Sequence, residues 1–432
     1  MKKILFTTVL LVLILPIHTS HAQRLNRTEK KIVEKVKSLD QASITFLEKV
    51  VNINSGTMNL EGVKAVGEEF DAAFKAIQFN TEWIEMPEEM NRAGHLFARI
   101  DGKRGKKLLL IGHLDTVFEA DSPFQTFERD GDFAYAPGGN DMKGGDVAIL
   151  FALRALHELN LLKDAGITVA LTGDEERTGK PLSISRKDLI EAAKVSDIAL
   201  GFETATGFNN ATIARRGASG WKVETAGKRA HSSGVFSDRT GAGAIFELSR
   251  ILNQFYEEVR GEEYLTFNPG NLLGGTFVNY ENLKSSGTAY GKSNVVAQTA
   301  VVHGGLRFIS EDQKQRARAK MRVIVADHLP STNATITFTD SYPAMGPIDE
   351  NKELLNQLSN VSEALGFGQV EAYDPGRRGA ADISFVAEYV PGLDGLGSMG
   401  TGAHTPQETV DLSTFNALIQ RTAVFIYRLT RD

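Results

Sequence analysis

The feature that most constrains the fold is the almost unbroken apolar run inside KKLLLIGHLDTV, residues 106–117. A strand that exposes one face alternates apolar and polar residues, so a continuous run predicts a strand covered on both faces. Further strands are predicted in GHLFARID, GITVALTGDE and SDIALGFET, and helices in residues 24–52, 60–78 and 142–159. This alternation predicts a layered α/β fold, whose polar chemistry gathers in the loops beyond the strand ends.

The sequence pattern changes near residue 215. Strands are predicted in ASGWKVETAGKRAH, SNVVAQTAVVHGGLRFI and NATITFTDSY, and helices in GAGAIFELSRILNQFYEEV and SEDQKQRARAKMRVIVADHL. This β-α-β-β-α-β-like order predicts a small open-faced sandwich with helices on one face. After two prolines, KELLNQLSNVSEALG and ADISFVAEYV resume helical patterns, and a Gly-rich end region follows. We interpret residues 215–340 as a domain inserted into a larger one of residues 23–214 and 341–432.

The first 22 residues have the pattern of a secretory signal. Two lysines precede an apolar stretch from Ile4 to Ile17, and Ser-His-Ala at 20–22 forms a small-x-small cleavage sequence. An uncleaved anchor is the alternative, but the apolar run is shorter than the roughly 20 residues that span a bilayer. We expect cleavage after Ala22 and a secreted protein, periplasmic or extracellular, without membrane attachment.

The composition excludes several classes of function. The chain has 432 residues, no cysteine and a net charge of −6. The absence of cysteine excludes a thiol nucleophile, a zinc ribbon and an iron–sulfur cluster. The acidic balance gives no indication of nucleic-acid binding, which favours a basic patch. Any metal ion must therefore be held by His, Asp and Glu.

Polar residues with the chemistry of a metal site follow the predicted strands. Taken singly, each has an ordinary interpretation: a partly buried His, a helix N-cap, a solvated acidic turn or a surface acid. Taken together, they lie where an α/β fold places its ligand crevice, and imidazole with carboxylates suits zinc, cobalt or manganese. The residues are His113 with Asp115, Asp141, the adjacent Glu175 and Glu176, Glu203 and His404.

Five segments of the chain, in order, resemble the signature segments of a known family. They are GHLDTV, GGNDMKGG, TGDEERTG, GKRAHSSG and GAHTPQETV. The family is that of the dizinc metallopeptidases, which include the glutamate carboxypeptidases (carboxypeptidase G), aminoacylase, peptidase T and succinyl-diaminopimelate desuccinylase. The resemblance covers roughly residues 30–430. It implies a three-layer α/β/α catalytic domain and an inserted ferredoxin-like lid and dimerisation domain.

The resemblance also implies a ligand set for two Zn²⁺ ions, with Co²⁺ or Mn²⁺ as alternatives. His113 and Glu203 are similar to the ligands of one ion, and Glu176 and His404 to those of the other. Asp141 is similar to the carboxylate that bridges the two ions. The peptide bond that follows it is typically cis in the family.

Three further residues have catalytic counterparts in the family. Asp115 resembles the acid that orients His113, and Glu175 resembles the general base. His231 resembles a histidine that reaches across a dimer to the substrate carbonyl. For Asp174, beside Glu175, no role is implied, and a solvated turn acid is its ordinary interpretation.

The resemblance is less direct for substrate binding. Arg307 and Asn294 are similar to lid residues that contact the substrate, the former its carboxylate. Where relatives have glycines before the last ligand, this chain reads GRRGAADIS, with Arg377 and Arg378. Guanidinium groups bind carboxylates bidentately, so Arg378 is a candidate for substrate binding, although both arginines also fit a surface role.

These resemblances predict an exported carboxypeptidase that hydrolyses an amide bond next to a free carboxylate, most like a glutamate carboxypeptidase. Its substrate is then a small peptide or an N-acyl amino acid, and a homodimer through the lid domain is implied. An aminoacylase or a dipeptidase of the same family is the alternative. A catalytically inactive binding relative is another, although a binding protein has no need of the base Glu175.

Overall fold

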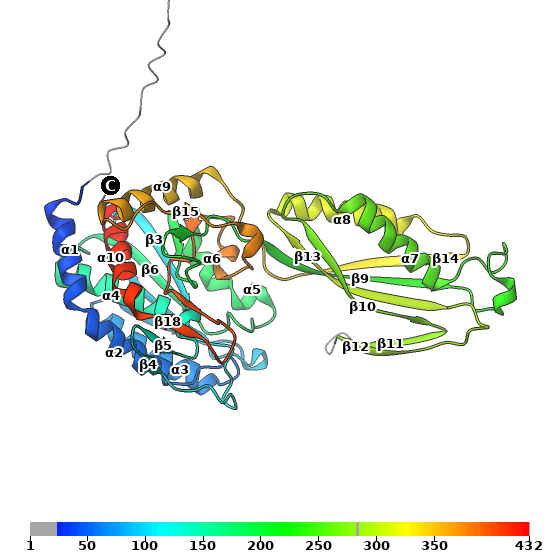
Figure 1. The fold of residues 1–432 in the computed structure, drawn as a ribbon, viewed down its shortest axis with the longest axis horizontal. Helices are drawn as coiled ribbons and strands as arrows, with labels where there is room; N and C mark the ends of the chain where they lie inside the picture. The colour runs from blue at the N-terminus through cyan, green and yellow to red at the C-terminus, as the bar shows by residue number, and fades with distance from the viewer. Residues whose placement is uncertain (1–23, 282–284, 432) are drawn as a thin grey trace, which may run out of the picture.

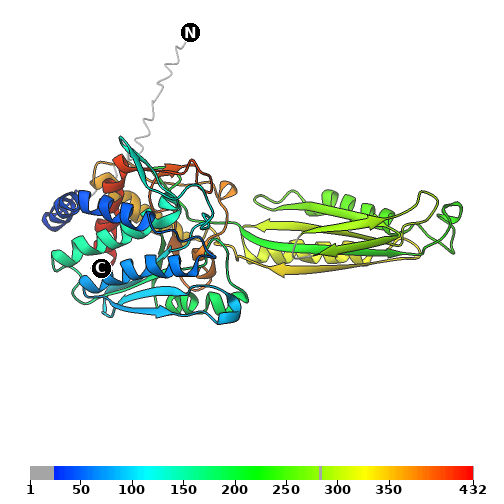
Figure 2. The ribbon, with the colours of Figure 1, turned by 90° about the horizontal axis from the view of Figure 1, so that it is seen from below.

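The computed structural model describes residues 24–281 and 285–431, and it divides into two bodies joined by two chain segments (Figures 1 and 2). The larger body contains both ends of the described chain, and the smaller one extends away from it as an elongated sheet with two helices on one face. The predicted signal peptide, residues 1–22, lies outside the described residues. Within the described ranges, no helix is both long and apolar enough to cross a bilayer.

The larger body is built around a six-stranded sheet in the order β1-β2-β6-β3-β7-β16. These strands are β1 (Asn80–Ile84), β2 (His95–Ile100), β3 (Arg104–His113), β6 (Ala165–Thr172), β7 (Ile198–Gly201) and β16 (Gly392–Leu393). The four strands β6, β3, β7 and β16 run parallel, whereas β1 and β2 run antiparallel to their neighbours. Short strands form smaller sheets, namely β4 (Glu128–Asp130), β5 (Phe133–Tyr135), β8 (Asn210–Ala211), β15 (Glu371–Ala372), β17 (Gly400–Thr401) and β18 (Thr409–Asp411).

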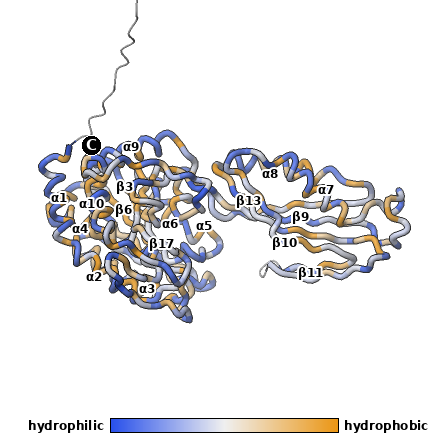
Figure 3. Tube along the Cα trace, in the orientation of Figure 1, coloured by the Kyte–Doolittle hydropathy of each residue, from blue (hydrophilic) through white to orange (hydrophobic). Residues whose placement is uncertain are grey.

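Helices cover both faces of this sheet. They are α1 (Arg27–Ser38), α2 (Asp40–Val51), α3 (Leu60–Ala76), α4 (Gly144–Glu158), α5 (Leu182–Ser185), α6 (Lys187–Lys194), α9 (Asp349–Ala364) and α10 (Leu412–Leu429). In β3, Leu108 and Leu110 pack in the main hydrophobic core, whereas Leu109 and Ile111 pack against the second core, which includes residues of α6. The continuous apolar run therefore forms a strand that is buried on both faces of the sheet, as predicted. Figure 3 shows hydrophobic stretches inside this body and hydrophilic ones around its outline.

The strand register brings the predicted polar residues to one edge of the sheet. His113 at the end of β3 lies opposite Thr172 at the end of β6, so the acidic turn after β6 begins beside it. On the other side, the Phe202 N–H donates to the Ile111 carbonyl at 2.9 Å, which places Glu203 at the same edge. Parallel pairing thus aligns loops that are far apart in the sequence.

The smaller body is the predicted open-faced sandwich. Its sheet has the order β10-β13-β9-β14, from β9 (Gly217–Gly227), β10 (Thr266–Gly275), β13 (Thr299–Phe308) and β14 (Thr332–Asp340). All pairs are antiparallel, and α7 (Ala244–Gln254) and α8 (Glu311–Ala326) cover one face. Numbered along this domain, the strand order is 4-1-3-2, as in ferredoxin-like sandwiches. The hairpin β11 (Phe277–Glu281) and β12 (Ser286–Tyr290) follows β10.

Several predicted elements differ in the structure. The helix expected over residues 24–52 is divided at Leu39 into α1 and α2. The helix expected in ADISFVAEYV is only a short 3-10 turn, Asp382–Phe385, because the segment crosses the second core just before Pro391. The predicted Gly-rich end region is instead followed by α10, whose residues are mostly buried against α1 and α4.

The two segments that join the bodies pair with each other. The Arg215 N–H donates to the Met345 carbonyl at 2.9 Å, and the Met345 N–H donates back at 3.0 Å. The Ala218 N–H also donates to the Tyr342 carbonyl at 2.8 Å. We call residues 214–216 the first linker and residues 341–346 the second linker.

Candidate metal centre

His113 lies at the centre of the predicted cluster. Its side chain is 1% exposed at the end of β3. Nδ1 faces the backbone carbonyl of Asp115 at 2.9 Å and its carboxylate at 3.5 Å, which leaves Nε2 free to point to the site. Both contacts of Nδ1 favour a hydrogen on that nitrogen, so Nε2 is the atom available to a metal ion.

The Asp115 carboxylate also holds the acidic turn in place. Oδ1 accepts the Glu175 N–H at 2.9 Å, and Oδ2 accepts the Glu176 N–H at 3.1 Å and the Thr57 hydroxyl at 2.6 Å. Asp115 is fully buried. One carboxylate therefore fixes the backbone of both adjacent glutamates, a role beyond the orientation of His113.

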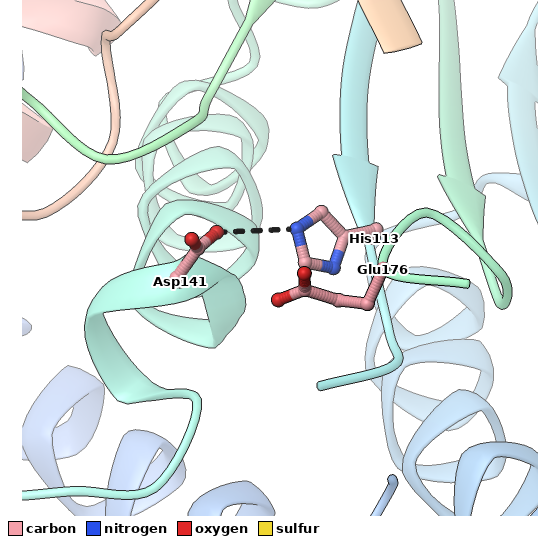
Figure 4. Close-up of side chains that lie close together, drawn as sticks. All are labelled: His113, Asp141 and Glu176. Atoms are coloured by element: carbon pink, nitrogen blue, oxygen red, sulfur yellow. Dashed lines mark hydrogen bonds and ion pairs between the residues drawn. The ribbon is translucent and has the colours of Figure 1, made fainter. Parts of the chain in front are cut away.

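Asp141 lies between the two predicted histidine ligands. Its Oδ1 is 3.3 Å from His113 Nε2, and its Oδ2 is 3.1 Å from His404 Nε2. Glu176 Oε2 lies 3.3 Å from the same nitrogen of His404. Figure 4 shows the side chains of His113, Asp141 and Glu176 directed toward one another. The two oxygens of one carboxylate thus face two separate imidazole groups.

Glu203 completes the half of the cluster that contains His113. Its Oε1 is 3.7 Å from His113 Nε2, and donor atoms of these two residues and Glu175 lie within 4.8 Å of one another. Its other oxygen lies 3.7 Å from Arg215 Nη2. Arg215 is itself buried and contacts Asp394 Oδ2 at 2.6 Å through Nε.

The close approach of these acids changes their protonation. Burial and the negative charge of Asp141 raise the pKa of Glu203 to about 7. Burial and the charge of Glu203 raise the pKa of Glu175 well above its usual range. Hydrogen bonds to Asp141 and Glu176 raise the pKa of His404 to about 11. The repulsion among the acids is the kind that a bound cation relieves.

Several ordinary interpretations of these residues are wrong. Asp141 caps no helix, because Lys143 is the residue that precedes α4 and the side chain of Asp141 faces the histidines. Glu176 and Glu203 are 6% and 15% exposed, so they form neither a solvated turn nor a surface acid. His404 alone is open, with 55% of its side chain exposed, and it marks the solvent side of the cluster.

Asp174 is not a solvated turn acid either. It is fully buried and accepts hydrogen bonds from the Gly179 N–H and the Ser185 hydroxyl, both at 2.7 Å. The buried guanidinium of Arg186 contacts its carboxylate and donates through Nε to Asp382 at 2.7 Å. Asp174 therefore anchors the acidic turn to the junction of α5 and α6 and, through Arg186, to the 3-10 turn after residue 381.

The loop around Asp141 is held from both sides. Glu408 Oε1 accepts the N–H groups of Asn140 and Asp141 at 2.9 and 3.1 Å. Buried Lys143 donates to the carbonyls of Val50 and Ile53, at the end of α2, both at 2.9 Å. The peptide bond after Asp141 is cis, as the resemblance implies. The geometry of Asp141 is thus set by the chain around it.

Of the two adjacent arginines, only Arg378 lies beside the cluster. Its Nη2 donates to the Thr204 carbonyl at 3.2 Å, next to Glu203, and its buried Nε has no hydrogen-bond partner among the described residues. Arg377 is exposed and lies over the Tyr373 ring. Arg307 is exposed at the end of β13 nearest the linkers, opposite Ala218 of β9.

His231 and Asn294 lie together but far from the cluster of their own chain. They are in the segments after β9 and before β13, at the end of the smaller body remote from the larger one (Figures 1 and 2). The Ser232 N–H donates to the Asn294 carbonyl at 2.9 Å, and both predicted residues are exposed. The structure therefore does not bring these two into one site with His113.

Sequence reasoning missed several residues of the site. Glu408 follows His404 by four residues inside the same motif, so its position was a usable signal. Arg215 and Tyr342 lie in the linkers, and only the pairing of distant segments brings them to the site. Nothing in the local sequence distinguishes them from other polar residues.

Comparison with known proteins identifies the family. The model of peptidase family M20/M25/M40 matches residues 109–428. The chain belongs to this family. It is 29% identical over 400 residues to carboxypeptidase G2 from Pseudomonas sp. (strain RS-16), covering 90% of this chain and 89% of that one. As a member it is a peptidase or amidohydrolase.

Solved structures agree with the fold. Aminopeptidase PepT from Bacillus cereus ATCC 10987 superposes with a TM-score of 0.69 at 15% identity, over 90% of this chain and 98% of its own. The Bacillus subtilis YXEP protein, described as a dinuclear metal-binding peptidase of family M20, gives a TM-score of 0.61 at 14% identity, over 91% and 98%. The M20 catalytic domain and its inserted domain are thus both present in this chain.

Proposed function

We propose that the cluster holds two divalent metal ions, zinc first and cobalt or manganese as alternatives. The donor set supports this proposal, because Asp141 directs one oxygen to His113 and the other to His404. Glu203 lies on the first side and Glu176 on the second. Glu176 Oε1 is buried without a hydrogen-bond partner among the described residues, as expected of an oxygen meant for a metal ion.

Glu175 is the residue proposed to move the proton. Its carboxyl group is buried beside His113 and Glu203, and burial with the charge of Glu203 raises its pKa above the usual range, which makes it a stronger proton acceptor than an exposed glutamate. Two bound cations would lower the pKa of a water molecule in the site. Glu175 accepts the proton of that water and passes it to the nitrogen of the leaving amine. Asp115 keeps Glu175 at the position that this transfer needs.

The proposed substrate is a small peptide or N-acyl amino acid with a free carboxylate next to the bond that is cleaved. Arg378 carries this part of the proposal, because its guanidinium binds the carbonyl of Thr204, next to Glu203, and its Nε–H has no partner within the described part of the chain. A guanidinium in such a place binds a carboxylate. Arg307, exposed at the end of β13 nearest the linkers, is a second candidate. Similarity to carboxypeptidase G2 supports the release of a C-terminal residue. The resemblance of the motifs to glutamate carboxypeptidases favours a residue like glutamate.

A homodimer through the inserted domain is part of the proposal. His231 and Asn294 can serve a catalytic site only if that site belongs to another copy, because they lie at the remote end of their own chain. The same end carries an apolar groove of about 700 Å³. Phe236 and Phe246 line it, 68% and 53% exposed, with ring centroids 5.4 Å apart. Exposed aromatic pairs of this kind mark protein interfaces.

We also propose that the protein is exported, on the evidence of its signal-like N-terminus, with the periplasm as the first location and the extracellular space as the alternative. An aminoacylase or a dipeptidase shares the metal cluster and differs in the contacts of the substrate. An inactive binding relative remains the alternative from another class. Retention of Glu175 with both ligand pairs argues against it.

One purified sample tests the proposal. Its metal content is measured first, and hydrolysis is then assayed with dipeptides ending in Glu, Asp or a neutral residue and with N-acyl amino acids. We expect about two metal ions per chain and the fastest turnover with C-terminal Glu. Substitution Glu175→Gln should retain the metal and lower kcat by about 10²- to 10⁴-fold. A metal-loaded protein that cleaves none of these substrates would refute the enzyme assignment.

A further inference from the structure

The second linker touches the turn that carries the proposed base. Tyr342 belongs to this linker, and its hydroxyl donates to the backbone carbonyl of Glu175 at 2.9 Å. The hydroxyl of Thr178, in the same turn, lies 2.6 Å from the Tyr342 oxygen. A phenol has one hydrogen, which Tyr342 gives to the Glu175 carbonyl, so Thr178 must be the donor of the second bond.

The Tyr342 side chain is itself held firmly. Its ring packs on the ring of Phe385 with centroids 4.9 Å apart. The guanidinium of Arg186 in turn lies over the Phe385 ring, 5.4 Å from its centroid. Burial, together with the charges of Glu175 and Asp382, raises the pKa of Tyr342 further above its ordinary value. The phenol is therefore protonated and able to donate at neutral pH.

The first linker makes a corresponding contact on the other side of the cluster. Arg215 directs its guanidinium to Asp394 and to Glu203, at 2.6 and 3.7 Å. The two linkers are hydrogen bonded to each other through Arg215 and Met345. Each linker thus contacts one residue of the cluster through a side chain. The hydrogen bonds between the linkers connect these two contacts.

We infer that Tyr342 is a positioning residue, through which the second linker holds the Glu175 turn in its productive position. The inference rests on the proposed role of Glu175 as the base. Asp115 holds the N–H of Glu175 and Tyr342 holds its carbonyl, so both peptide groups that flank the base are fixed. A base displaced by a fraction of an ångström loses alignment with its proton donor, whereas the groups that bind the substrate are unaffected.

The test compares three single variants and one double variant of the full-length, metal-loaded protein. Tyr342→Phe removes the bond to the Glu175 carbonyl and keeps the ring on Phe385. Thr178→Val removes the second bond, together with the 3.4 Å contact of this hydroxyl to the Glu175 carbonyl, and keeps the phenol. Tyr389→Phe is the matched control, because Tyr389 is exposed and belongs to the same domain. The double variant removes both hydroxyls, since the Thr178 hydroxyl lies 3.4 Å from the Glu175 carbonyl and can partly replace the phenol.

We expect kcat to fall by about 10- to 100-fold in Tyr342→Phe with KM within about threefold of the parent. The fall should be smaller in Thr178→Val, largest in the double variant and absent in Tyr389→Phe. Metal content should be equal in all of them. Hydrogen exchange of the peptide covering residues 174–180 should be faster in Tyr342→Phe than in the parent and the control.

The inference is overturned if Tyr342→Phe keeps kcat within twofold, or if exchange of residues 174–180 is unchanged. It is also overturned if Tyr342→Phe loses metal in proportion to its loss of kcat. Hydrogen exchange needs no substrate, so it decides the positioning contact even if the parent protein cleaves nothing. A parent protein that cleaves no substrate would refute the proposed function without deciding whether Tyr342 positions the turn.

Discussion

At the scale of single residues, two buried glutamates titrate near neutral pH in the absence of metal. Burial is the main cause for both Glu203 and Glu408, whose pKa values are raised from 4.5 to about 7. Between pH 4.5, the ordinary pKa of these groups in the unfolded chain, and pH of about 7, their pKa in the folded chain, the folded chain holds more protons than the unfolded chain. The free energy of unfolding therefore decreases as the pH rises through this window, by about 1.4 kcal/mol for each unit of pKa difference per group.

We predict that the metal-free protein melts at a lower temperature at pH 7.5 than at pH 5.5. The raised pKa of His404 acts in the same direction above pH 6.5, because the protonated folded form is the stabilised one. Zinc should raise the Tm more at the higher pH, where the carboxylates are ionised. Calorimetry with and without chelator at both pH values measures this. A metal-free Tm that rises with pH would contradict it.

The residues of the candidate cluster were largely predictable from the sequence, because each stands at the end of an apolar strand or in a Gly-rich loop. His113, Glu176 and Glu203 illustrate this. The contacts that support them were not readable. Arg215 and Tyr342 reach the cluster from the linkers. Asp174 looks like a surface acid in the sequence, and only the fold brings Arg186, between α5 and α6, into contact with it.

At the scale of elements, the buried contacts of Arg186 join the acidic turn, the junction of α5 and α6, and the 3-10 turn at residues 382–385. Removing one partner of a buried ion pair leaves the other charge uncompensated. We therefore predict that Asp174→Ala lowers the free energy of unfolding by about 3–5 kcal/mol. The matched control is Asp71→Ala, which removes the exposed pair with Lys75 on α3 and should cost less than about 1 kcal/mol.

Denaturant unfolding of both variants and the parent measures the difference. Equal effects of the two substitutions would show that the Asp174 contacts contribute no more than a surface pair. The difference between the two variants should persist with metal present, because metal that binds both equally adds the same stability to each.

Elements were predictable where apolar periodicity was strong and local. Strand β3 and helices α3, α8 and α9 follow the predicted segments closely. Strand β10 did not stand out, because its asparagines and glycines carry little strand signal and Pro269 accompanies a register shift. Its pairing with β13 decides its structure. The segment 381–390 shows the reverse, since its helical pattern yields to packing against the sheet.

At the scale of the whole molecule, the separation of His231 from its own cluster leads to a prediction about mixed dimers. Glu175→Gln and His231→Ala homodimers should each be nearly inactive. In a mixed dimer, one of the two sites combines an intact base with an intact histidine from the other chain. Equal mixing after dissociation should therefore restore about a quarter of the parent sites.

Activity of the separate and mixed variants, with the oligomeric state measured by light scattering, tests this. No recovery from a mixture that demonstrably contains mixed dimers would show that His231 does not act across an interface. Phe246→Glu, in the apolar groove, should give monomers without activity but with the metal still bound.

The last helix has a consequence for how the chain is made. Helix α10 packs against α1 and α4 in the main core, and Arg428 of α10 donates to buried Glu29 of α1 at 2.8 Å. The sheet of the inserted domain is complete by residue 340, whereas the larger domain lacks part of its core until residues 412–429 have left the ribosome. Domains fold as units during synthesis, so the inserted domain can form first and the larger one only at the end. Under the proposed export, the larger domain is therefore the part of the chain that is still unfolded when synthesis ends.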